Sequence, residues 1–212
     1  MFSFSTAVNS LGQSGPPCLT RLSIRKASPV NSSRLQVLLW PYIFLIVFTS
    51  CRLVESAGSG THIGSNNIIS PDSHIGNDCN IGSNNIIYKK SYIGNDCTIG
   101  NNVVIENSHI GDGCKIANNE VITNSHIGSA CNIANNEAIT NSYIGNGCNI
   151  ENNVIISNSN IGNYCRIGNN VNVVGSRILN NVNIMVNSKV INSFVGDNVV
   201  IPVNSIVVNR SQ

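Results

Sequence analysis

Residues 91–141 read SYIGNDCTIGNNVVIEN, SHIGDGCKIANNEVITN and SHIGSACNIANNEAITN, three units of seventeen residues that follow one another without a gap. The unit continues to the end of the chain, and an eighteen-residue version, SHIGNDCNIGSNNIIYKK, begins at Ser73. Each unit divides into three segments that begin with an aliphatic residue, such as Ile93, Ile99 and Ile105, and the first segment of the next unit begins at Ile110. Self-similarity at a fixed period of this kind is the sequence signature of a solenoid.

Three aliphatic residues per unit, each followed by small or turn-forming residues, predict a coil with three flat sides and three corners. One coil cannot bury its own aliphatic side chains, so successive coils must stack and align them in columns. Asn pairs such as Asn101-Asn102 and Asn118-Asn119 suit the corners, because Asn tolerates left-handed backbone angles and its amide can bond the amide one coil away. The predicted fold is therefore all-β, a single-stranded parallel β-helix of triangular cross-section with about eight and a half coils of 17–18 residues.

The composition divides the chain into a leader, residues 1–60, and the solenoid, residues 61–212. Residues 1–54 contain no Asp or Glu, and residues 37–48 form an unbroken apolar run. Such a run is too short for a comfortable membrane span and is typical of a signal peptide. We expect a signal peptide, a membrane anchor or a transit peptide, and hence a secreted or membrane-associated protein, with organelle import as the alternative.

The charge of the solenoid argues against several classes of partner. Of the ten acidic residues in the chain, nine follow residue 60, so the net positive charge of the whole chain comes from the leader. A solenoid with no basic stripe and no interleaved aromatic residues is not expected to bind nucleic acid. Membrane contact is expected only through the leader, and no motif predicts a cofactor.

The pattern I-G-N-x-C-x-I-G-N-N-x-x-I, which begins at Ile93, resembles the hexapeptide-repeat, left-handed parallel β-helix proteins. It is most similar to the C-terminal domains of sugar-nucleotide pyrophosphorylases of the mannose-1-phosphate guanylyltransferase type and of related translation initiation exchange-factor subunits. The resemblance covers residues 61–212 and implies a left-handed coil and a homotrimer. Pyrophosphorylases carry their chemistry in a large N-terminal domain, for which the leader leaves no room, so that activity is not expected here.

Cysteine recurs at one position of successive coils and is replaced there by Val182 and Val199 in the last two. Because Val fits the same place, the column favours packing as small buried apolar side chains. Stacked cysteines also lie within the range of disulfide bonding in an oxidising compartment, whereas a line of residues does not converge on a metal, and no metal site is predicted. The candidates for bridging are Cys79, Cys97, Cys114, Cys131, Cys148 and Cys165.

A second column precedes the first aliphatic residue of each coil and is rich in His and Tyr. It is expected to face outward as an exposed aromatic ladder. The resemblance makes His109 and His126 candidate catalytic residues, since hexapeptide acyltransferases use a solenoid histidine as general base and carbonic anhydrases of this fold bind zinc with histidines of two subunits. Neither pattern is matched residue by residue.

Two carboxylates, Glu120 and Glu137, occur in an otherwise apolar or small inward column. We expect a local change of register that turns both outward, because an unpaired buried charge is costly. If they faced inward, one of them would be expected to hold a proton.

The third side of the coil carries the most apolar outward residues, and a continuous apolar strip usually marks an interface. This predicted binding face suits a homotrimer or a protein partner. Its regular hydroxyl groups also leave open an ice-binding surface. The residues concerned are Val104, Val121, Thr123, Ala138, Thr140, Ile155 and Ser157.

The sequence therefore favours a non-catalytic solenoid that serves as a structural, binding or oligomerisation module. The alternatives are a hexapeptide-repeat transferase, related to acyl- or nucleotidyltransferases, with a site between subunits at His109 or His126, and an ice-binding protein.

Overall fold

The structure is a computed structural model that describes residues 57–211, and the solenoid in this range consists of 26 short strands. Within this range no helix is long and apolar enough to cross a membrane. The predicted leader lies outside the described residues, apart from its last four positions.

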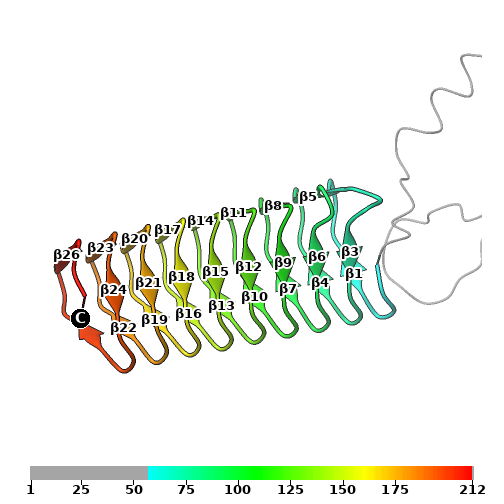
Figure 1. The fold of residues 1–212 in the computed structure, drawn as a ribbon. Coiled ribbons are helices and arrows are strands. Elements are labelled where there is room, and N and C mark those ends of the chain that lie inside the picture. Colours follow the sequence, from blue (N-terminus) through cyan, green and yellow to red (C-terminus); the bar gives the residue numbers. More distant parts are fainter. Residues whose placement is uncertain (1–56, 212) are drawn as a thin grey trace, which may run out of the picture. The chain divides into compact units, whose positions relative to one another are not determined.

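The strands form three parallel sheets, one for each side of the coil, and Figure 1 shows the coils stacked along one axis. Sheet A contains β3 (His74–Ile75), β6 (Tyr92–Ile93), β9 (His109–Ile110), β12 (His126–Ile127), β15 (Tyr143–Ile144), β18 (Asn160–Ile161), β21 (Arg177–Ile178) and β24 (Phe194–Val195). Sheet B contains β1 (His62–Ile63), β4 (Asn80–Ile81), β7 (Thr98–Ile99), β10 (Lys115–Ile116), β13 (Asn132–Ile133), β16 (Asn149–Ile150), β19 (Arg166–Ile167), β22 (Asn183–Ile184) and β25 (Val200–Ile201). Sheet C contains β2 (Ile68–Ile69), β5 (Ile86–Tyr88), β8 (Val104–Glu106), β11 (Val121–Thr123), β14 (Ala138–Thr140), β17 (Ile155–Ser157), β20 (Asn172–Val174), β23 (Lys189–Ile191) and β26 (Ile206–Val208).

Each strand pairs with the equivalent strand of the next coil, and the pairing aligns the aliphatic residues. Ile110 pairs with Ile127 in sheet A, and Ile122 pairs with Ile139 in sheet C. These side chains are fully buried. Since burying an aliphatic side chain of this size contributes about 1.5–3 kcal/mol, the columns supply the main stabilisation of the stack. The predicted parallel β-helix is confirmed.

The corners between the strands use left-handed backbone angles, as predicted for Asn. Asn102, Asn119 and Asn136 have φ angles of 58°, 65° and 69°. Their amides form a ladder, with Asn102 Nδ2 donating to Asn119 Oδ1 at 3.2 Å and Asn119 Nδ2 donating to Asn136 Oδ1 at 3.2 Å. The Asn ladder therefore both turns the chain and links successive coils.

Three columns of inward residues fill the corners of the coil. The cysteines lie between the strands of sheets A and B, the column of Glu120 and Glu137 lies between sheets B and C, and a serine column lies between sheets C and A. All three columns are buried along most of the described solenoid.

The expected outward turn of Glu120 and Glu137 is wrong. Glu120 is 0% exposed and Glu137 is 2% exposed. The strands that follow them keep the common register, with Val121 paired to both Val104 and Ala138. A one-residue slip would turn Ile122 and Ile139 out of the core, whereas a carboxyl group can enter the interior uncharged by keeping its proton.

Candidate functional site

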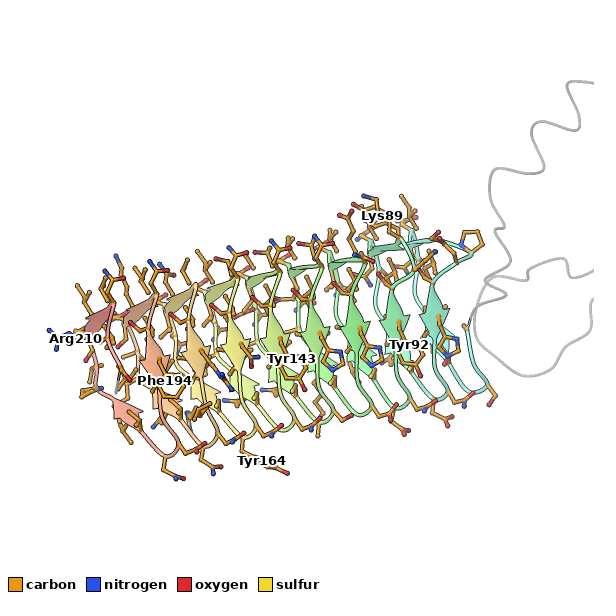
Figure 2. The ribbon with its side chains drawn as sticks, viewed as in Figure 1. Lys89, Tyr92, Tyr143, Tyr164, Phe194 and Arg210 are labelled. Carbon is orange, nitrogen blue, oxygen red and sulfur yellow. The ribbon has the colours of Figure 1, made fainter. Side chains whose placement is uncertain are left out.

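The His and Tyr column of sheet A forms the outward aromatic ladder that the sequence predicts. Parallel pairing places each ring above the next, and Figure 2 shows Tyr92 and Tyr143 projecting from the same face of the stack. The ring centroids of His109 and His126 are 4.7 Å apart with an interplanar angle of 4°. Tyr92 stacks on His109 at 4.6 Å, and Tyr143 stacks on His126 at 4.9 Å. The two candidate histidines are thus held between two tyrosine rings.

A groove of about 860 Å³ runs alongside this ladder. We call it the ladder groove. Tyr92, His109, His126 and Tyr143 form one wall, and the other wall is the corner between sheets C and A. The residues of that corner and of the groove end are Lys90, Asn107, Ser108, Asn124, Ser125, Asn141, Ser142, Asn158 and Ser159.

The serines of the groove are structural. Ser125 Oγ donates to the Thr123 carbonyl at 2.8 Å and accepts the Ser142 N–H at 3.1 Å. Ser108 Oγ makes the equivalent bonds to the Glu106 carbonyl and the Ser125 N–H. Since these hydroxyl groups are buried and already bonded, they brace the corner and are not available as nucleophiles.

The asparagines of the groove turn the chain and present amides to it. Asn107, Asn124 and Asn141 have φ angles of 46°, 49° and 48°. Asn107 Nδ2 donates to Asn124 Oδ1 at 2.9 Å, and Asn141 Nδ2 donates to Asn158 Oδ1 at 3.3 Å. The remaining amide hydrogens and lone pairs are suited to a polar ligand along this wall.

The ring nitrogens of His109 and His126 make no hydrogen bond within residues 57–211. Partial burial, and then the neighbouring His126, lower the pKa of His109 below its ordinary value of 6.5, against a smaller opposing effect of Asp112. At neutral pH the His109 imidazole is therefore mostly uncharged and can accept a proton. The described residues contain no group of three or more His, Cys, Asp or Glu side chains that could hold a metal ion.

The six cysteines of the column are buried free thiols in this structure. Cys114 Sγ contacts the Gly128 carbonyl at 3.0 Å, and Cys131 Sγ contacts the Gly145 carbonyl at 3.1 Å. Burial raises the pKa of the Cys79 thiol. These contacts fit the packing interpretation, while disulfide bonding under oxidising conditions stays a prediction.

The predicted binding face is the outer surface of sheet C. Val121 and Ile155 are 41% and 46% exposed, while Val104, Ala138, Thr123, Thr140 and Ser157 are half-buried. The residues that were predicted to point outward do so, but a partner and an ice-binding role stay predictions. This face ends at the asparagine wall of the ladder groove, because Asn107, Asn124 and Asn141 directly follow strands β8, β11 and β14.

The sequence identified the ladder but not the groove beside it. The available signal was the Asn-Ser dipeptide before each ladder residue, as in Asn107-Ser108 and Asn124-Ser125. The dipeptide does not predict the groove by itself, since the outward direction of the Asn amide depends on its backbone angle.

Comparisons with known proteins agree with this architecture. Residues 63–161 match the family described as the GMPPB C-terminal domain. Among solved structures, UDP-N-acetylglucosamine O-acyltransferase (LpxA) from Moraxella catarrhalis RH4 is 21% identical with a TM-score of 0.46, covering 69% of this chain and 66% of that one. UDP-N-acetylglucosamine acyltransferase from Campylobacter jejuni is 17% identical with a TM-score of 0.46, covering 68% of this chain and 64% of that one.

A third structure, the polySia specific acetyltransferase NeuO, is 18% identical with a TM-score of 0.29, covering 71% of this chain and 76% of that one. This chain thus spans slightly less than two thirds of the two acyltransferases. No curated protein matches the sequence. The match to the GMPPB C-terminal domain thus covers residues 63–161, slightly less than half of the chain, and these residues lie in a solenoid of stacked parallel strands.

Proposed function

We propose that the solenoid is a hexapeptide-repeat transferase whose site is the ladder groove, with His109 as general base. The observation that carries the proposal is the pair of imidazoles, His109 and His126, which line the groove without a hydrogen-bond partner among the described residues. A neutral imidazole in a groove large enough for a ligand is what proton abstraction from a hydroxyl group requires.

The reaction that suits these residues is acyl transfer to a hydroxyl group. His109 accepts the hydroxyl proton while the hydroxyl oxygen attacks the carbonyl carbon of an acyl thioester. The C–S bond then breaks, and the leaving thiolate takes the proton back from the imidazolium. This sequence needs a base and correct positioning, and no metal or redox cofactor.

The other groove residues have positioning roles. Asn124 and Asn141 offer amide hydrogen bonds to a sugar or an amide of the substrate. Lys90, at one end of the groove, offers an ammonium group to a phosphate, such as that of a nucleotide-containing donor. His126 lies against His109 and limits its rotation through stacking.

The groove of one chain is open, so the site needs a second wall to exclude water. The apolar face of sheet C borders the asparagine wall, and Val121 and Ile155 are exposed there. Association of two or three copies through this face would set a neighbouring solenoid beside the groove. We therefore include a homo-oligomer, a trimer by resemblance, in the proposal.

An acyl-transfer assay tests this function on the full-length chain. With acetyl-coenzyme A as donor and a panel of nucleotide sugars as acceptors, released thiol reports turnover. We expect His109→Asn to reduce kcat/KM by about 10²-fold or more. His74→Asn is the matched control, since His74 stacks in the same ladder but does not line the groove. Equal activity of wild type and His109→Asn would reject His109 as the base.

The pH profile adds a second readout. Because the pKa of His109 lies below 6.5, the acid limb of kcat/KM is expected below about pH 6.5. If the acid limb of kcat/KM lay above about pH 7, the essential base would be a group other than His109.

The second candidate is a non-catalytic binding or oligomerisation module. It is favoured by the family match, which is to a C-terminal domain, and by the regularity of the coils. Binding of a nucleotide sugar to the groove without turnover with any thioester donor would select this candidate.

A further inference from the structure

The inward column between sheets B and C contains an arrangement that the proposed function does not use. Three of its polar members donate a hydrogen bond to a backbone carbonyl. Asn67 Nδ2 donates to the Gly82 carbonyl at 2.8 Å, and Asn85 Nδ2 donates to the Gly100 carbonyl at 2.9 Å. Near the other end, Ser188 Oγ donates to the Pro202 carbonyl at 2.9 Å. The column thus accepts a polar side chain that supplies a donor.

Asn85 and Ser188 also accept a hydrogen bond from the next coil. Asn85 Oδ1 accepts the Val103 N–H at 2.7 Å, and Ser188 Oγ accepts the Ser205 N–H at 3.2 Å. Glu120 repeats this half of the pattern, since its Oε2 accepts the Glu137 N–H at 2.9 Å. Its Oε1 is buried and has no hydrogen-bond partner.

Glu137 occupies the same position of the column one coil further on. Neither of its carboxyl oxygens has a partner as an acceptor, and its side chain is buried. Ionised carboxylates carry no hydrogen to donate, whereas a carboxylic acid has one. Each of the two acids could therefore supply the donor that Asn67, Asn85 and Ser188 supply elsewhere in the column.

No opposite charge faces the pair from the elements packed around it. The members of the column in the adjoining coils are Val103 and Val154, both fully buried. The titratable group that faces each glutamate is the other glutamate. The other inward titratable groups of the same coils are the thiols Cys114 and Cys131, which lie at the corner between sheets A and B. A charge at either position would thus be both desolvated and uncompensated.

We propose that Glu120 and Glu137 form a buried acid pair that holds at least one proton at neutral pH and makes the solenoid lose stability as the pH rises. The retained proton supplies a hydrogen-bond donor to the column, and the unfolded chain, in which both groups are solvated, releases it.

The titration behaviour of the two groups supports the geometry. Burial, and then the hydrogen bond and charge of Glu137, raise the pKa of Glu120 from 4.5 to about 9. Burial also raises the pKa of Glu137, against the smaller lowering effects of the hydrogen bond from Glu120 and of backbone N–H groups. A carboxyl pKa that is higher in the folded state than in the unfolded state makes the folded state bind more protons between the two values.

The sign of the pH effect follows from this difference. Below about pH 4.5 both states are protonated and the pair contributes no pH dependence. Above that value the unfolded chain loses its protons first, so stability falls with pH up to the folded-state pKa. The unfolding equilibrium constant is expected to rise about tenfold per pH unit for each proton held.

The test compares the full-length, reduced wild type with Glu120→Gln/Glu137→Gln from about pH 5 to about pH 8. Gln keeps the shape and supplies an amide donor without a titratable proton. We expect denaturant midpoints of the wild type to fall with pH and those of the variant to fall much less. Glu151→Gln, at a surface carboxylate paired with Arg166, is the control and should follow the wild type.

A second variant and a direct probe keep the test decisive if the glutamine variant does not fold. Glu120→Val/Glu137→Val copies the neighbouring Val103 and Val154 and should also lose the pH dependence. Infrared spectra of the wild type at pH 7 should contain a protonated-carboxyl band that both double variants lack. Parallel pH profiles, no such band, or one bound metal ion per chain that the variants lose would overturn the acid pair.

Discussion

At the scale of the residue, equivalent positions of this solenoid share one environment, so each column can be interpreted from its substitutions. The cysteine column shows this most directly, because Val182 occupies it with 1% exposure, as Cys131 does. This position therefore requires a small apolar side chain and does not require a thiol. The contact between the thiol and a backbone carbonyl adds only weakly to the stability of the stack.

We therefore expect Cys131→Val to change the free energy of unfolding by less than about 1.5 kcal/mol, as volume-conserving core substitutions do. Ile127→Ala, in the same coil, should cost about 2–5 kcal/mol because it leaves a cavity. Denaturant unfolding of both variants under reducing conditions measures the difference. A loss of several kcal/mol in Cys131→Val would mean that the thiol itself is required.

The orientation of most side chains could be predicted from the sequence, but that of the buried glutamates could not. The inward aliphatic residues and the outward ladder were predicted, because period and residue type determine them. The orientation of Glu120 was predicted wrongly, since the sequence gives its charge at neutral pH in water and not its protonation state in a buried column. Register, set by Ile122 and its neighbours, outweighs the preference of a carboxyl group for water.

At the scale of the element, the coil is the unit of folding. Each strand bonds only to the equivalent strands of the coils before and after it. The three sides and the Asn corners were predicted from the seventeen-residue period, and the strands are two or three residues long. The ladder groove was not predicted, because it depends on how the amides of Asn107, Asn124 and Asn141 emerge from a left-handed corner.

This organisation predicts that one coil can be removed. Excision of residues 142–158 joins Asn141 to Ser159 and keeps every column in register, so the shortened chain should fold with its parallel sheets intact. Circular dichroism and thermal unfolding check the result. Excision of eight residues from the same coil is the control, since it breaks all three columns and should abolish cooperative unfolding.

At the scale of the whole molecule, the solenoid places a polar groove and an apolar face side by side at one corner. The ladder groove lines sheet A, the apolar face covers sheet C, and the asparagine wall separates them. A second copy that docks on the apolar face would therefore also shape the groove. The acid pair, Glu120 and Glu137, lies at a different corner, between sheets B and C. The outcome of the experiment on the acid pair therefore does not affect the proposal for the ladder groove.

The most direct test of the groove follows the imidazole resonances of the full-length chain by NMR while GDP-mannose, and separately acetyl-coenzyme A, is added. His109 and His126 line the groove, and His74, one ring beyond Tyr92, provides an internal reference. The account predicts that at least one ligand shifts the resonances of His109 and His126 along a single saturation curve and leaves that of His74 in place. Unchanged resonances of both groove histidines with either ligand would contradict it.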